Sequence, residues 1–143
     1  MESASSKFLI RSFSEYPGPR YDIQGEHSGE EFYHSVLNQL FVGALQSKQK
    51  IEIVLDGTAG YASSFLDQAF GSLVYDFGQE SVERFVSIIS SEEPDWISLI
   101  RQKVYVEWQN RRNKNLPPKV TKVHGEWFRL VDGKLEKRVW IQP

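Results

Sequence analysis

Cysteine is absent from the 143 residues of this chain, which excludes disulfide bonds, thiolate metal sites and cysteine nucleophiles. No apolar run approaches the roughly 20 residues that a membrane-spanning helix needs, and the first residues lack the pattern of a secretory signal. Hydrophobic residues make up 40% and charged residues 25%, values typical of a globular chain. We therefore expect a soluble, cytoplasmic protein that does not associate with membranes.

The common motifs of catalysis and cofactor binding are also missing. There is no Gly-x-x-x-x-Gly-Lys-Ser/Thr phosphate loop, no dinucleotide fingerprint and no Gly-x-Ser-x-Gly nucleophile elbow. The three histidines, His27, His34 and His124, share no metal-ligand spacing, so we expect no metal site and no cofactor. Without a base to take its proton a serine is a poor nucleophile. The sequence predicts that the protein is not an enzyme.

Charge is distributed unevenly along the chain, although the net charge is only −2. Residues 1–100 contain 6 Lys or Arg and 15 Asp or Glu, whereas residues 101–143 contain 11 and 4. An acidic body followed by a basic segment suits docking to an acidic partner or to nucleic acid. It equally suits a segment that packs against the body, and composition does not choose between these alternatives.

Four segments have the composition of β-strands. Residues 50–56 are apolar at nearly every position, which is typical of a parallel strand covered on both faces. The other expected strands are residues 7–13, 20–25 and 81–90.

Three helices are expected between these strands. Ser28, with Glu31 three residues later, predicts a capping box and a helix that ends near residue 46. The second helix begins at Ser63–Ser64, one of which is expected to cap it, and Gly71 should permit a close approach to a neighbour. The third begins near Pro94 and ends near residues 111–115. Its apolar stripe is typical of a helix laid on a sheet and consists of Ile97, Ile100, Val104 and Trp108.

After residue 115 the apolar pattern changes from helical to alternating. Residues 120–131 and 134–141 flank Asp132-Gly133, which is a strong β-hairpin signal because both residues tolerate positive φ. The chain therefore predicts an α/β domain over residues 1–115 and a basic β-hairpin extension over residues 116–143.

The stretch LDGTAGYASSFLDQAFGSL, residues 55–73, is the best candidate for a functional site. Asp56 ends the central strand, and Ser63 and Ser64 arrive at a helix N-terminus, whose free N–H groups and positive dipole end favour an anion. A phosphoryl group there would be electrostatically favoured. The simpler alternative is that one serine only caps the helix. An enzymatic role for Asp56 and the serines ranks last, because no base or cofactor motif accompanies them.

Two stretches, SGEEFYHSVLNQL and IEIVLDGTAGYASSFLDQAFGSL, resemble the STAS-like domain of bacterial and phage proteins, formerly a domain of unknown function. That group is a distant relative of the STAS domain of anti-sigma-factor antagonists. The resemblance covers roughly residues 20–101 and implies a STAS-like sheet with packed helices.

In the antagonists, a partner kinase with a GHKL-type ATPase fold phosphorylates the first serine of an Asp-Ser-Ser-Gly motif. By that motif Ser63 is the matching position, although Ala62 and Phe65 replace the flanking aspartate and glycine. The resemblance implies a regulatory module that docks on a GHKL-type ATPase or kinase. The expected docking and phosphorylation residues are Ser63, Ser64, Asp56, Tyr61 and Asp67.

The basic segment supports a second hypothesis, binding of nucleic acid by cations and aromatic rings on strands. Its expected contacts are Arg111, Arg112, Lys119, Lys122, Arg129, Lys137 and Arg138. The favoured alternative is that Trp127, Phe128 and Trp140 pack against the body while the lysines face solvent. A homodimer that shares or swaps the hairpin is a further expectation.

Overall fold

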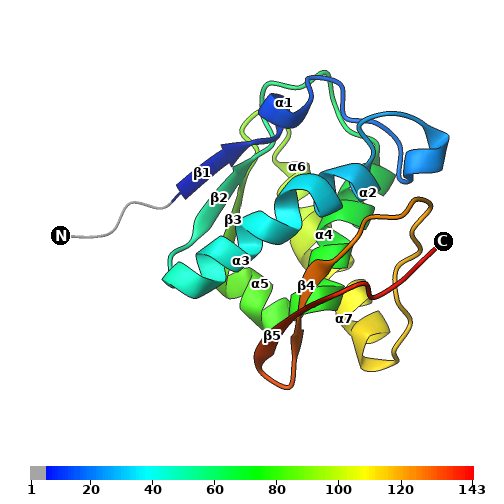
Figure 1. Cartoon of the computed structure of the whole chain (residues 1–143). Helices are drawn as coiled ribbons and strands as arrows, with labels where there is room; N and C mark the ends of the chain where they lie inside the picture. The colour runs from blue at the N-terminus through cyan, green and yellow to red at the C-terminus, as the bar shows by residue number, and fades with distance from the viewer. Residues whose placement is uncertain (1–5) are drawn as a thin grey trace.

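The computed structural model describes residues 6–143. Residues 1–5 belong to the N-terminal stretch that lacks the pattern of a secretory signal, and they lie outside the described residues. Three short parallel strands form the main sheet, in the order β1-β2-β3 (Figure 1). They are β1 (Ser6–Leu9), β2 (Ile51–Val54) and β3 (Val86–Ile89). The expected central parallel strand at 50–56 is therefore confirmed as β2.

The two faces of this sheet are covered to different extents. Phe8, Ile53 and Ile88 are in register on the face that contributes to the core. On the other face Lys7 and Glu52 form an ion pair of 3.9 Å and are partly exposed. The expectation of a strand covered on both faces holds in part, because Val54 on this second face is buried whereas Glu52 is half-buried.

Helical turns replace the second half of one expected strand and all of another near the N-terminus. The strand expected at 7–13 ends at Leu9, and α1 (Ile10–Phe13) follows because Ile10 is fully buried and its carbonyl accepts from Ser14 N. Residues 20–25 contain the 3₁₀ turn η1 (Asp22–Gln24) instead of a strand. Side chains take the backbone donors that a strand would need, since Glu30 accepts from Asp22 N.

The first long helix is confirmed and is continuous through three elements. These are α2 (Gly29–Phe32), the π-helical turn η2 (Tyr33–Leu37) and α3 (Asn38–Ser47). Ser28 caps it, because its Oγ accepts from Glu31 N at 2.9 Å. The Glu31 carboxylate accepts from His27 N at 3.1 Å, one residue earlier than in a capping box.

Helix α4 (Ser63–Phe77) is the central helix and is buried along most of its length. Its N-cap is Ala62, with no capping side chain, so the prediction that Ser63 or Ser64 caps the helix is wrong. The serines occupy the first two helical positions instead. Gly71 does permit a close approach, because a Cβ at this position would lie 2.1 Å from Nε1 of Trp108.

The strand expected at 81–90 is half helix. Helix α5 (Gln79–Phe85) precedes β3 because Val82 turns inward to the core from a helical position. The third long helix is confirmed and consists of α6 (Asp95–Leu99), the π-helical turn η3 (Ile100–Val104) and α7 (Tyr105–Asn113). Its apolar stripe packs mainly on α4 rather than on the sheet.

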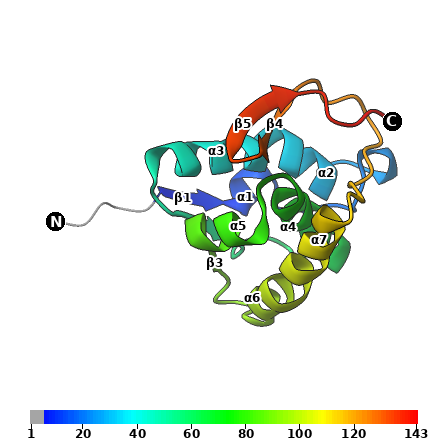
Figure 2. The same cartoon turned by 90° about the horizontal axis from the view of Figure 1, so that it is seen from below.

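The C-terminal hairpin is confirmed, with β4 (Trp127–Val131) antiparallel to β5 (Lys134–Arg138). Asp132 and Gly133 have φ angles of 51° and 78°, as a tight hairpin turn requires. The first expected strand begins only at Trp127, because residues 120–126 bond to the body instead of to a strand. The hairpin lies over α3 and α4, across the molecule from α6 (Figure 2). The boundary at residue 115 stays a prediction.

Within residues 6–143, no helix combines the length and the apolar composition that crossing a membrane requires.

Candidate functional site

The loop between β2 and α4 contains the residues that the sequence singled out, and internal contacts hold several of them. The Asp56 carboxylate accepts from the backbone N–H groups of Glu92 and Ser91, at 2.8 and 3.1 Å, and these bonds lower its pKa. The Tyr61 hydroxyl donates to the carbonyl of Leu55 at 2.7 Å, and burial raises the pKa of Tyr61 to about 12. Both side chains therefore fix the loop to the end of the sheet.

The two serines at the start of α4 are less constrained. Ser63 is exposed and Ser64 is half-buried. Asp67, one turn further along, accepts from Nη1 of Arg20 at 2.6 Å and from the indole of Trp108 at 3.1 Å. Asp67 thus joins α4 to α7 and to the segment before η1.

Four of the five expected docking residues line two separate hollows, and Ser64 lines neither. Asp56 and Tyr61 border one with Trp96. Ser63 and Asp67 border the other with Arg20 and Lys103. The structure therefore does not place the Asp56 carboxylate in the hollow that Ser63 borders.

The basic residues expected to contact nucleic acid divide into internal and surface groups. Arg111 lies 4.0 Å from the ring centroid of Trp108, Arg112 donates to the carbonyl of Tyr75, and Arg129 donates to Asp76 at 2.7 Å. Arg112 and Arg129 connect separate elements of the fold, whereas Arg111 contacts a ring of its own helix, α7.

The remaining cations of this group are exposed. Lys119 lies 5.4 Å from the ring centroid of Tyr21, and Lys137 lies 5.2 Å from that of Phe128. Arg138 pairs with Glu136, while Lys122 makes a backbone bond to Glu30.

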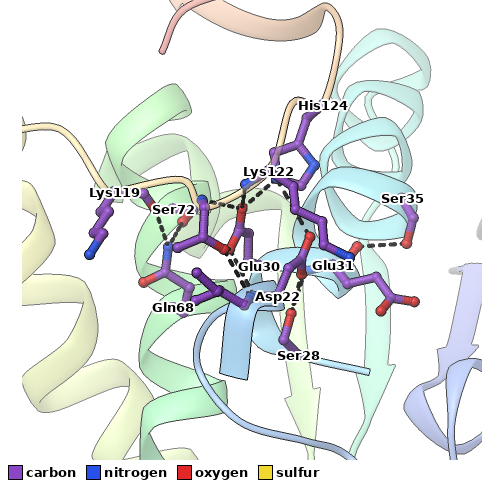
Figure 3. Close-up of polar contacts among 12 residues, drawn as sticks. Asp22, Ser28, Glu30, Glu31, Ser35, Gln68, Ser72, Lys119, Lys122 and His124 are labelled. Atoms are coloured by element: carbon purple, nitrogen blue, oxygen red, sulfur yellow. Dashed lines mark hydrogen bonds and ion pairs between the residues drawn. The ribbon is translucent and has the colours of Figure 1, made fainter. Parts of the chain in front are cut away.

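A cluster that the sequence did not reveal surrounds the fully buried carboxylate of Glu30 on α2 (Figure 3). His124 Nε2 lies 2.5 Å from Glu30 Oε2, and the N–H and hydroxyl of Thr121 donate at 2.7 and 2.6 Å. Asp22 N donates at 2.9 Å. Burial acts to raise the pKa of Glu30, but the hydrogen bonds from these groups outweigh it and lower the pKa to about 2.

His34 and Asp22 complete the surroundings of this carboxylate. The ring of His34 stacks on His124 with centroids 3.9 Å apart, and burial lowers the pKa of His34 to about 3. Ligand atoms of Asp22, Glu30 and His124 all lie within 4.8 Å of one another, which is compact enough for a metal ion. Both oxygens of Glu30 already accept hydrogen bonds, however, so the arrangement works as an anchor for residues 121–124. Residues this far apart in the chain give no local sequence signal.

A second buried carboxylate, Asp76 on α4, holds the hairpin. It accepts from the Tyr33 hydroxyl at 2.5 Å, the Trp127 indole at 3.0 Å and Arg129 Nε at 2.7 Å. Burial raises the pKa of Asp76 and outweighs the opposing effect of Arg129 and of the hydrogen bonds. Asn38 adds a reciprocal pair of bonds to the backbone of Phe128, at 3.0 Å each. The favoured expectation that the hairpin aromatics pack on the body holds for Trp127, which is buried.

Comparison with known families decides the nature of the central region. The model of a family described as a STAS-like domain of unknown function matches residues 28–96. Residues 28–96 form a STAS-like domain. The expected resemblance is thereby confirmed, and the STAS-like domain contains the loop and helix start with Ser63. No curated protein and no solved structure matches the chain.

Proposed function

We propose that the STAS-like domain is a non-enzymatic regulatory module that binds a protein partner through residues 57–67 and is switched by phosphorylation of Ser63. The observation that carries this proposal is the position of Ser63. It is exposed at the first position of a 15-residue helix whose N-terminus has no capping side chain. A kinase could reach this hydroxyl without unfolding the helix.

The helix terminus at Ser63 favours a phosphate. The N–H groups and dipole of the first turn of α4 attract an anion. Arg20 and Lys103 border the same hollow and add positive charge, although Arg20 is paired with Asp67 and Glu107 adds a negative charge. A phosphoryl group would add roughly −1.5 to −2 charges at this point. It would change the potential of the docking surface while leaving the buried part of α4 intact.

The partner that we propose is a GHKL-type ATPase or kinase, by analogy with the anti-sigma-factor antagonists that the STAS-like domain resembles. Phosphorylated Ser63 would repel an acidic docking site or bring an unpaired charge into a closely packed interface. Either effect weakens the complex.

Capture from the native host tests this function with a matched pair of variants. Wild-type protein, Ser63→Glu and Ser35→Glu are used as baits, and Ser35 is an exposed serine that borders neither hollow. We expect a stoichiometric ATPase partner on the wild type and on Ser35→Glu, and its loss from Ser63→Glu. Intact mass of the native protein should show a phosphate at Ser63. Equal binding by all three baits, together with unphosphorylated Ser63, would contradict the proposal.

The exposed cations of the C-terminal segment favour the second candidate function, binding of nucleic acid. Lys119 and Lys137 lie at the surface beside the aromatic rings of Tyr21 and Phe128, an arrangement that suits a phosphate backbone with stacked bases. The same capture experiment distinguishes the two functions. Nucleic acid recovered with all three baits and lost as salt rises, without a protein partner, would assign the function to this segment.

A further inference from the structure

The hydroxyl of Tyr105 is a buried polar group that forms no hydrogen bond with the described residues. Tyr105 is the first residue of α7 and is 1% exposed. Its hydroxyl has no hydrogen-bond partner among residues 6–143. Buried hydroxyl groups are nearly always bonded, so an unpartnered one needs an explanation.

This residue borders a small hollow of about 150 Å³ between β3 and the helix formed by α6, η3 and α7. Strand β3 is at the edge of the sheet, since the strand order ends with it. Besides Ser87 and Ile88 of β3, the hollow is lined by Lys50, Glu83, Val86, Ile97, Arg101 and Tyr105. It shares none of its lining residues with the hollow beside Ser63.

Two charged residues of the hollow, Glu83 and Arg101, act on the Tyr105 hydroxyl. Burial raises the pKa of Tyr105, the Glu83 carboxylate raises it further, and the Arg101 guanidinium opposes them. Within the described part of the chain, neither Lys50, Glu83 nor Arg101 forms an ion pair. Two cations and one anion, all exposed, therefore line the same hollow as the residue that carries this unused donor.

Size and lining restrict what could bind here. A liquid water occupies about 30 Å³, so the hollow has room for a molecule of about five non-hydrogen atoms. Val86 and Ile97 provide apolar surface, whereas Lys50 and Arg101 favour negative charge. Glu83 disfavours a dianion such as hydrogen phosphate and can pair with an ammonium group. These features together favour a small monoanionic acid with a short carbon chain.

We propose that this hollow is a binding site for a small carboxylate, whose oxygens accept from the Tyr105 hydroxyl and pair with Arg101 and Lys50. The planar guanidinium of Arg101 is suited to two parallel hydrogen bonds with a carboxylate. A ligand with an ammonium group beside its carboxylate, such as a small amino acid, would also pair with Glu83.

Three probes of similar size test the site: propionate, alanine and inorganic phosphate. Each is titrated into the full chain at constant ionic strength, and the backbone amide shifts of Ser87 and Tyr105 are followed by NMR. We expect saturable shifts with propionate or alanine and weaker binding of phosphate. Propionate and alanine differ by the ammonium group, so tighter binding of alanine would assign a role to Glu83. Tighter binding of propionate would show that Glu83 has no role and that the two cations and the hydroxyl bind the carboxylate.

Tyr105→Phe is the decisive variant, because it removes only the unpartnered oxygen. Its thermal midpoint should equal or exceed that of the wild type, since no hydrogen bond within the protein is lost. Its affinity for the carboxylate should fall about tenfold, the effect of one charge-assisted hydrogen bond. Arg101→Gln should weaken binding at least as much, whereas Arg84→Gln, on the exposed side of α5, should leave it unchanged.

Three results would overturn the proposal. One is the absence of saturable shifts with both carboxylates. Another is tighter binding of phosphate than of either carboxylate. The third is equal affinity of Tyr105→Phe and the wild type, which would show adventitious binding away from the hydroxyl.

Discussion

Glu30 and Asp76 are both buried carboxylates that hold the C-terminal segment, yet the fold shifts their pKa values in opposite directions. The pKa of Glu30 is lowered to about 2, and that of Asp76 is raised. Both carboxylate oxygens of Glu30 accept hydrogen bonds, and three of the donors are backbone N–H groups. Asp76 accepts from three side chains and depends on Arg129 for its only ion pair among residues 6–143. The hydrogen bonds of the His124 and Thr121 side chains, followed by those of backbone N–H groups, lower the pKa of Glu30, whereas burial dominates at Asp76.

Replacement of Asp76 by alanine should have the largest effect, because it leaves the half-buried Arg129 guanidinium without its partner. Loss of one member of a buried ion pair typically costs about 3–5 kcal/mol. The free energy of unfolding in urea measures this loss. Asp76→Asn keeps the shape and part of the hydrogen bonding, so it should cost less. Equal stability of Asp76→Ala and the wild type would show that the hairpin does not depend on this carboxylate.

Glu30→Gln should lower the free energy of unfolding by about 1–3 kcal/mol, which is less than the loss expected for Asp76→Ala. It removes the charge of the carboxylate that accepts more hydrogen bonds. One glutamine nitrogen would face donors such as Thr121 N, which then lack an acceptor. Urea unfolding measures the change, and hydrogen exchange at residues 121–124 localises it. Glu31→Gln, on the same helix turn, is the matched control. A larger loss for Glu30→Gln than for Asp76→Ala would reverse the comparison.

The same contrast explains what sequence analysis could and could not find. Signals that depend on neighbours along the chain were sufficient for Ser28 as a cap and for the Asp132-Gly133 turn. The partners of Glu30 come from Asp22 and from residues more than 90 positions away, so no spacing indicates them. The strand expected at 20–25 failed for this reason, because a distant side chain takes the backbone donor of Asp22.

The docking residues divide in the same way. The helix start at Ser63 was predicted from its local pattern, within a residue of its observed position. The bonds of Asp56 to Ser91 and Glu92, and of Asp67 to Arg20, join segments that only the folded chain brings together. Tertiary contacts therefore determine which of the predicted residues remain available to a partner.

The smallest expected effect is on the pH dependence of stability, and it comes from His34, whose ring stacks on His124 beside Glu30. The pKa of His34 is lowered to about 3 by burial, so the folded protein binds fewer protons than the unfolded chain between pH 6.5 and 3. Stability from this residue is complete above pH 6.5 and is lost as the pH falls. Glu30 acts with the same sign, but only below about pH 4.5, whereas the raised pKa of Asp76 has the opposite sign.

His34→Phe keeps an aromatic ring against His124 and removes the titration. Between pH 6.5 and 5, its unfolding free energy should fall less steeply than that of the wild type, by up to about 1.4 kcal/mol per pH unit. Urea titrations at several pH values measure the slope, and the value at pH 8 is the internal control, because packing alone contributes there. An unchanged slope between pH 6.5 and 5 would show that His34 can be protonated in the folded protein. A proton would then reach the ring beside the Glu30 cluster without unfolding of the protein.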